Sequence, residues 1–200
     1  MLNVKNAEIA DLEQIMKIYR YAQDYMIKSG NPTQWGHFYP DADLIKSDID
    51  KNACKVIYDK DGIHGVFSVF DGAEPNYKHI EGGNWLNEEP YLTIHRLAGD
   101  GQVHGLFPCA LNYCKKISLN IRVDTHADNK TMQRLIEKNG FIKCGTIYVK
   151  NGTARIAYQR TDFRAARFAS ISLNTTRSVA RSVSSSVDRH SDNWQEIVER

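Results

Sequence analysis

The stretch LAGDGQVHGLF, residues 97–107, decides how the rest of the sequence is interpreted, because it places three glycines between an apolar run and a helix-like run. The preceding YLTIHRLA has strand character and the following PCALNYCKK has helical character. A glycine-rich turn between a strand and a helix either holds a phosphate on free backbone N–H groups or is an ordinary tight connection. Gly99, Gly101 and Gly105 fit neither the dinucleotide G-x-G-x-x-G pattern nor the P-loop. Any phosphate held here therefore belongs to a different class of ligand.

The composition is that of a soluble globular protein. The chain has 200 residues, of which 42% are hydrophobic and 25% charged, and its net charge is +2. A charge so close to neutral does not favour a nucleic-acid partner. The N-terminus lacks the apolar segment of a signal peptide, and no apolar run approaches the roughly 20 residues of a membrane-spanning helix. The four cysteines show neither C-x-x-C nor zinc spacing, so we expect reduced thiols in a cytoplasmic protein with no metal and no membrane partner.

Hydrophobic spacing and turn residues predict the order of the structural elements up to residue 160. We expect a strand at 2–5, helices at 11–28 and 41–51, a hairpin at 54–70, a polar loop, a strand at 91–98, a helix at 107–116, a strand at 118–126, a helix at 128–140 and a hairpin at 141–159. This order predicts an α/β (α+β) fold, in which helices pack on a mixed sheet.

The composition changes near residue 161. Every lysine lies before residue 162, and the segment that follows uses arginine and serine instead. We therefore expect a domain at 1–161 and an Arg/Ser-rich extension at 162–200. Val179, Val183 and Val187 have helical spacing, so the extension is either partly disordered or marginally helical. Its six arginines face five acidic residues, which leaves too little charge to favour nucleic acid.

Two motifs and the element order carry a family resemblance. Gln102 and Gly105 fit a Q/R-x-x-G-x-G/A phosphate loop, and the next helix begins at Asn129 and ends in Gly140–Phe141. Residues 1–160 thereby resemble the GNAT superfamily of acetyl-CoA-dependent N-acetyltransferases. The resemblance implies a mixed central sheet of about seven strands with helices on both faces, the acyl-CoA N-acyltransferase-like fold.

The resemblance implies that acetyl-CoA is the co-substrate. Its pyrophosphate would lie on the loop, and its pantetheine arm would pair with the backbone of 96–98 where the strands at 91–98 and 119–125 splay apart. Phe107 stands where the family has Gly or Ala, and we expect its ring to point into the core. Asn129 would either bind the arm or simply cap its helix. The residues assigned to acetyl-CoA are Arg96, Leu97, Ala98, Gln102, Val103, His104, Gly105, Leu106, Phe107 and Asn129.

The reaction implied is attack of a primary amine on the thioester, directly in a ternary complex. A free alkylamine has a pKa near ~10.4, so a base must take its proton. Strand alternation places Tyr91, Thr93, His95 and Leu97 on one face, and Arg96 on the other, beside a carboxylate. The family often has its base at the position of Thr93, which cannot serve, so His95 is our candidate base. A hydrogen-bonded structural histidine is the alternative.

The general acid and the acceptor site complete the expectations. The tyrosine with which many family members protonate the leaving thiolate corresponds to Ile136 here, and we assign Tyr148 to that role instead. Loops carry the candidate acceptor residues, which are Trp35, Tyr39, Trp85 and Tyr91. The expected acceptor is a small-molecule or peptide amine, and because this fold often dimerises, a homodimer is one expectation for assembly. The alternative function is a catalytically inactive CoA-binding or sensor module.

Overall fold

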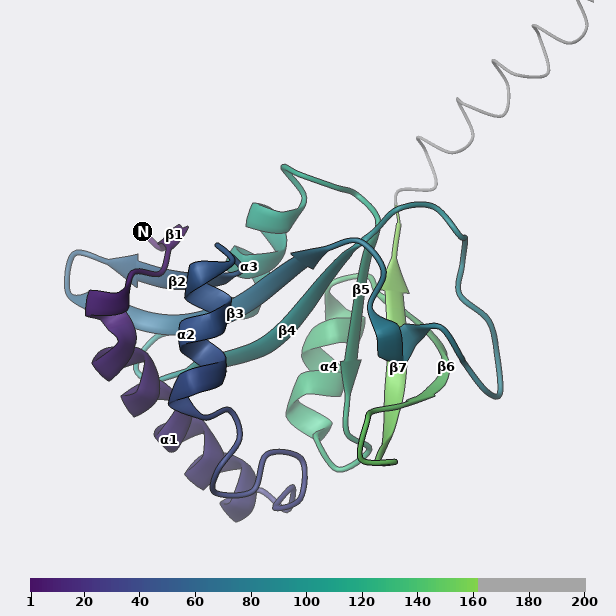
Figure 1. Cartoon of the computed structure of the whole chain (residues 1–200), viewed down its shortest axis with the longest axis horizontal. Coiled ribbons are helices and arrows are strands. Elements are labelled where there is room, and N and C mark those ends of the chain that lie inside the picture. The colour runs from purple at the N-terminus through teal and green to yellow at the C-terminus, as the bar shows by residue number, and fades with distance from the viewer. Residues whose placement is uncertain (162–200) are drawn as a thin grey trace, which may run out of the picture. The chain divides into compact units, whose positions relative to one another are not determined.

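The computed structural model describes residues 1–161, so the extension expected at 162–200 lies outside the described residues (Figure 1). The described part forms one sheet of seven strands in the order β1-β2-β3-β4-β5-β7-β6. The strands are β1 (Asn3–Asn6), β2 (Cys54–Asp59), β3 (Gly62–Asp71), β4 (Leu92–Gly99), β5 (Ile121–Thr125), β6 (Ile142–Tyr148) and β7 (Ala154–Arg160). The α-helices are α1 (Leu12–Lys28), α2 (Ala42–Asp50), α3 (Leu106–Cys114) and α4 (Lys130–Lys138). Within residues 1–161, no helix combines the length and the apolar character needed to cross a membrane.

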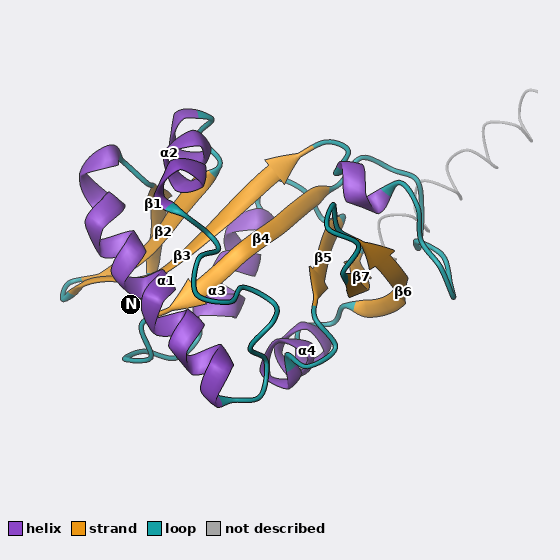
Figure 2. Ribbon diagram, turned by 60° about the horizontal axis from the view of Figure 1, so that its bottom comes forward, coloured by secondary structure: helices purple, strands orange, loops and turns teal. Residues whose placement is uncertain are grey.

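The sheet is mixed and covered on both faces, as predicted. β4 and β5 run parallel, whereas the other neighbouring strands pair antiparallel. Adjacent strand residues alternate between the two cores: Val66 packs with α1 and α2, and Phe67 packs with α3 and α4. Figure 2 shows the two pairs of helices on opposite sides of the strands. The alternation of apolar residues thus produces a three-layer arrangement with two buried cores.

The parallel strands β4 and β5 separate soon after they begin. They are paired only at Leu92–Ile121 and Thr93–Arg122, and beyond these pairs the two strands diverge (Figure 1). The backbone of β4 after Thr93 therefore has no strand beside it on the β5 side. Such a gap can accept an added peptide-like strand through main-chain hydrogen bonds.

A bulge at Arg96 interrupts the alternation of β4. Arg96 has a left-handed backbone (φ 53°), and the β3–β4 register shifts at this point. The residue after the bulge, Leu97, consequently packs with the α3 and α4 core, and the Arg96 guanidinium lies 5.3 Å from the Phe70 ring that also contacts His95. The expectation that Leu97 shares a face with His95, and that Arg96 lies opposite, was wrong, because the extra residue inverts the pattern. The pairing of Arg96 with a carboxylate is present, and its partner is Asp48.

Candidate functional site

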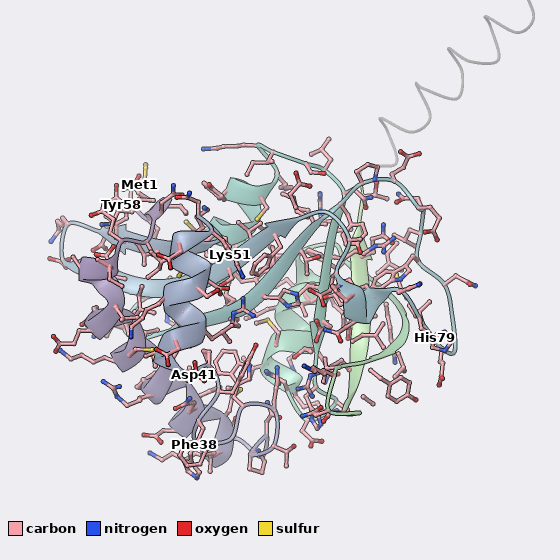
Figure 3. All side chains as sticks on the ribbon, in the orientation of Figure 1. Met1, Phe38, Asp41, Lys51, Tyr58 and His79 are labelled. Carbon is pink, nitrogen blue, oxygen red and sulfur yellow. The ribbon has the colours of Figure 1, made fainter. Side chains whose placement is uncertain are left out.

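A cleft of about 1400 Å³ opens where β4 and β5 separate. Its walls come from β4, the turn before α3, the end of β5, the start of α4, α1 and the loop at residues 29–41. Trp35 and Tyr39 of that loop line the cleft, as expected of acceptor-site residues, while Phe38 projects into solvent and is 87% exposed (Figure 3). One space therefore runs from the N-terminus of α3 to the splayed strands.

The N-terminus of α3 has an open backbone suited to an anion. Gly105 caps the helix in a left-handed conformation (φ 86°), and a side chain there would have no heavy atom within 4 Å. No side chain caps the first turn, so the N–H groups of Leu106 and Phe107 are free of the usual capping bond. A pyrophosphate can approach these groups along the helix dipole. The residues present therefore fit the diphosphate of a coenzyme A.

All of the residues expected to contact acetyl-CoA except Gln102 line the cleft. The Phe107 ring is 3% exposed and lies 6.0 Å from the ring of Phe141, so the bulky residue in the loop points into the core, as predicted. Gln102 is exposed, and its backbone N–H donates to Asp100. The expected residues that line the cleft are Arg96, Leu97, Ala98, Val103, His104, Gly105, Leu106, Phe107 and Asn129.

Asn129 caps α4 and also lies at the cleft, where binding of the pantetheine arm was the other role considered for it. Its Oδ1 accepts the backbone N–H of Met132 at 3.0 Å, which caps α4. Its Nδ2 donates to Gln34 at 3.0 Å, and the residue lines the cleft. Asn129 therefore ties the loop at residues 29–41 to α4 at the edge of the cleft.

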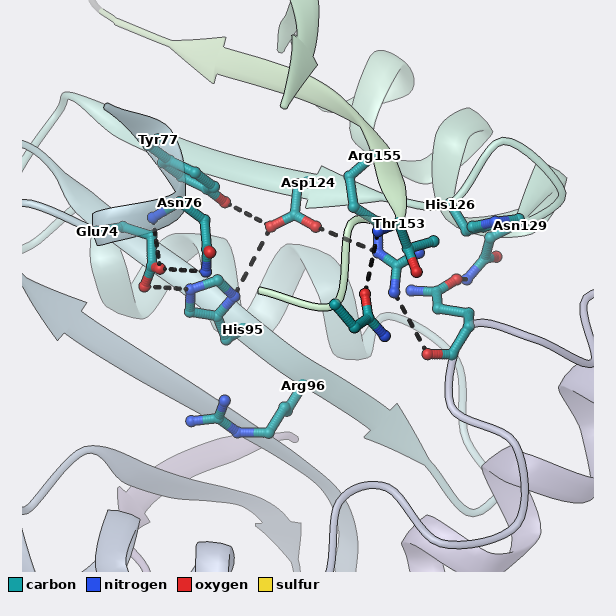
Figure 4. Close-up of polar contacts among 12 residues, drawn as sticks. Glu74, Asn76, Tyr77, His95, Arg96, Asp124, His126, Asn129, Thr153 and Arg155 are labelled. Atoms are coloured by element: carbon teal, nitrogen blue, oxygen red, sulfur yellow. Dashed lines mark hydrogen bonds and ion pairs between the residues drawn. The ribbon is translucent and has the colours of Figure 1, made fainter. Parts of the chain in front are cut away.

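His95 lies in the cleft between two carboxylates (Figure 4). Its Nε2 is 3.2 Å from Glu74, and its Nδ1 is 3.9 Å from Asp124. The hydrogen bond with His95 is the main reason that the pKa of Glu74 is lowered, so Glu74 is a carboxylate near neutral pH. Asn76 holds the same carboxylate through its backbone and side-chain N–H groups. This arrangement fixes the orientation of the His95 ring.

Asp124 connects His95 to two residues that the sequence did not single out. Its Oδ1 accepts the Tyr77 hydroxyl at 2.7 Å, and its Oδ2 lies 3.8 Å from Nε of Arg155 on β7. Burial raises the pKa of Tyr77 well above its usual value, with Asp124 adding to the effect, so Tyr77 remains a hydrogen-bond donor. The cleft thus contains a chain of polar groups from Glu74 to Arg155 (Figure 4).

Three expected site residues lie elsewhere. Tyr148 donates to Glu81, is 43% exposed on the face of β6 opposite the buried Ile147, and does not line this cleft, so its role as the acid stays a prediction. Trp85 and Tyr91 enclose the guanidinium of Arg122 at 4.0 and 3.8 Å and do not line the cleft, and their acceptor role stays a prediction too. Both aromatic rings therefore pack on the buried guanidinium of Arg122.

Position 136, where the family resemblance implies a general acid, has no proton-donating side chain. Ile136 is fully buried in the core beneath α4. The aliphatic side chain of Ile136 cannot donate a proton. The features that remain at the site are the anion-accepting helix end, the splayed strands and the His95 network.

A mixed seven-stranded sheet with a splay, and a glycine-capped helix at that splay, define the acyl-CoA N-acyltransferase fold. Comparison with solved structures finds acetyltransferases of the GNAT family. An acetyltransferase of the GNAT family from Streptococcus agalactiae 2603 matches with 28% identity and a TM-score of 0.74, over 80% of this chain and 95% of that chain. A putative acetyltransferase from Staphylococcus aureus Mu50 matches with 27% identity and a TM-score of 0.58, over 79% and 97%. The described part of the chain has the fold of these GNAT-family acetyltransferases, and acyl transfer is the reaction class that the likenesses support.

A third solved structure shares the fold. It is yncA, a putative acetyltransferase from Salmonella typhimurium with its cofactor acetyl-CoA, at 16% identity and a TM-score of 0.54 over 80% of this chain and 94% of that chain. No protein-family model matches the sequence, and no curated protein does.

Proposed function

We propose that the protein is an N-acetyltransferase that moves the acetyl group of acetyl-CoA to a primary amine by direct attack in a ternary complex. One observation carries this proposal: a single cleft joins the open N-terminus of α3 to His95 beside the splayed strands. A helix end for the diphosphate, a strand edge for the peptide-like arm and a histidine at the same gap are the groups that such a transfer needs.

His95 is the general base of the proposed reaction. When its Nε2–H donates to Glu74, the lone pair is on Nδ1, and the 3.9 Å from Nδ1 to Asp124 is too long for a hydrogen bond. Nδ1 is thus free to accept a proton from an amine that binds beside the ring and Asp124. Glu74 balances the charge that His95 then carries. Glu74 is therefore a positioning residue and His95 a catalytic one.

The strand edge after Thr93 orients the acyl donor. Acetyl-CoA supplies the thioester that acylates the amine, the C–N bond forming as the C–S bond breaks. Leu97 and Ala98 line the cleft, whereas the Arg96 carbonyl already accepts the Tyr19 hydroxyl at 3.0 Å. A thiol pKa near ~8.5 makes the thiolate a fair leaving group, so the reaction does not require a tyrosine at position 136.

Release of free thiol from acetyl-CoA in the presence of a panel of primary amines tests the proposal. We expect turnover by the wild-type chain, and a loss of at least about 100-fold in kcat/KM in His95→Ala with CoA affinity retained. His79→Ala is the matched control, because His79 is 78% exposed and lies outside the cleft. Unchanged turnover in His95→Ala would refute the base. A chain that binds CoA but acetylates no amine would be the inactive binding module, and a chain that does not bind CoA would refute both functions.

A further inference from the structure

The guanidinium of Arg155 has more hydrogen-bond donors than the protein satisfies. Arg155 is 9% exposed and lines the cleft, yet its Nη1 is buried without a hydrogen-bond partner. Nη2 donates to the Gln34 carbonyl at 3.4 Å, and Nε is 3.8 Å from Asp124. A guanidinium has five N–H donors, and leaving donors of a buried charge unpaired costs stability. This group is better explained as one that awaits an anionic partner.

The position of Arg155 relative to the proposed base indicates that its anionic partner belongs to the acceptor substrate. Asp124 lies between the two groups, with Oδ1 3.9 Å from His95 Nδ1 and Oδ2 3.8 Å from Arg155 Nε (Figure 4). An amine bound at His95 is therefore separated from the Arg155 guanidinium by the carboxylate of Asp124. The rest of the molecule that carries this amine is therefore the part of the bound substrates that lies nearest to Arg155.

Of the two arginines that line the cleft, Arg155 is the one with unused donors, and the lysines of the lining, Lys138 and Lys150, are exposed to solvent. Arg96 also faces the cleft, but Asp48 neutralises it through Nε and Nη2, and its Nη1 donates to Tyr39 at 3.2 Å. Asp124 is shared among Tyr77, His95 and Arg155 and accepts a short hydrogen bond only from Tyr77. The acceptor end of the cleft thus offers carboxylates to an ammonium group and a guanidinium to an anion.

We propose that Arg155 binds a carboxylate of the acceptor, so that the substrates are amines that carry a carboxylate, with amino acids as the simplest members. This inference rests on the proposed N-acetyltransferase function. The planar guanidinium fork matches a carboxylate with two parallel hydrogen bonds, and the incoming oxygens take the place of the weak 3.4 Å contact with Gln34. The aromatic rings of Trp35, Tyr39 and Phe70 line the same cleft and favour an apolar remainder.

The test compares amino acids with their carboxamides. L-phenylalanine, β-alanine and γ-aminobutyrate are each assayed with acetyl-CoA beside the matched carboxamide, which retains the amine and loses the negative charge. We expect kcat/KM for at least one acid to exceed that of its carboxamide by about 30-fold or more, the loss that follows when one partner of a buried charge pair is removed. Amine basicity opposes this preference, because the carboxamide is deprotonated more readily and is intrinsically the better nucleophile near neutral pH.

Two variants assign that preference to one side chain. Arg155→Met keeps the length and removes the charge, and we expect the ratio of acid to carboxamide to collapse toward one while CoA affinity is retained. Arg155→Lys keeps a charge without the fork and should retain part of the ratio. A general loss of structure would lower both rates together and leave the ratio unchanged, so the ratio separates recognition from stability.

The outcomes distinguish this inference from the function beneath it. Acetylation of carboxamides or simple amines as efficiently as acids in the wild-type chain would overturn the carboxylate site and leave the proposed function standing. A ratio that survives Arg155→Met would overturn the role of Arg155. Absence of acetylation across every amine tested, with CoA bound, would overturn the proposed function and this inference with it.

Discussion

Replacing Asp48 should be among the most damaging single substitutions outside the cores, because three donors converge on one of its oxygens. Asp48 is 2% exposed on α2, and its Oδ2 accepts from Ser68 Oγ at 2.7 Å and from Arg96 Nε at 3.0 Å and Nη2. Asp48→Ala leaves a largely buried guanidinium and a buried hydroxyl without their acceptor. Arg96 keeps only its bond to Tyr39 and its contact with the Phe70 ring.

The expected loss can be estimated from these contacts. Breaking a buried ion pair by removing one partner costs about 3–5 kcal/mol of the free energy of unfolding. That loss corresponds to roughly 6–20 °C in Tm for a domain of this size. Asp48→Asn keeps the shape and one acceptor oxygen, so it should cost less, about 1.5–3 kcal/mol, the value of hydrogen bonds to a charged group. Asp48→Leu combined with Arg96→Met removes both charges and should cost less than the sum of the two single changes.

Urea unfolding of the full chain, followed by tryptophan fluorescence and by circular dichroism, measures these differences. Coincident transitions would justify a two-state treatment. A cost for Asp48→Ala below about 1 kcal/mol would refute the reasoning, since that is the range of an exposed ion pair. Strict additivity in the double variant would show that the two residues are not coupled.

Two further predictions concern the phosphate loop. His64 hydrogen-bonds Asp100 of the loop at 2.9 Å and Asp59 at 3.0 Å, and the bond to Asp100 is the main reason that its pKa is raised. The contribution of His64 to stability should be complete below about pH 6.5 and decline as the pH rises through its raised pKa. The difference in the free energy of unfolding between wild type and His64→Gln, measured by urea unfolding, should therefore shrink with increasing pH. A difference that stays constant with pH would contradict this prediction. Phe107→Ala should cost about 3–5 kcal/mol of stability in the same assay, because the ring packs on Phe141 in the core. The affinity of folded Phe107→Ala for CoA, measured by calorimetry, should be unchanged, and a marked loss would place the ring at the phosphate.

The fold could be predicted from the sequence because its local signals are strong and agree with one another. The helices and strands occupy the expected ranges to within a few residues. Apolar spacing marks α1, and the turns of the two hairpins lie at Lys60–Asp61 and Asn151–Gly152. The expected loop before α3 followed from the resemblance at Gln102 and Gly105, and the inward direction of Phe107 followed from the need for a small residue only nearest the phosphate. Each of these features depends on residues that are close in the sequence.

The site was less predictable, because its contacts join residues far apart in the sequence. Glu74 lies in a polar loop, and nothing local indicates that it meets His95, 21 positions later. Trp85 and Tyr91 have the composition of an acceptor pocket, but Arg122 on β5 binds both rings instead. Asp124 offered one signal that could have been used, a carboxylate in a short, largely buried strand directly beside the splay.

The bulge at Arg96 explains why strand periodicity failed at the decisive point. A left-handed residue other than glycine costs about 1–2 kcal/mol, and Asp48 and the Tyr19 hydroxyl offset that cost by binding the side chain and the carbonyl of Arg96. Without the extra residue, Leu97 would face α1 and Ala98 would face α3. The cores require the opposite, since the small Ala98 packs with α1 and Leu97 with α3. The same bulge places His95 and Arg96 together on the cleft side of β4, so the packing of the two cores and the assembly of the site depend on one irregularity.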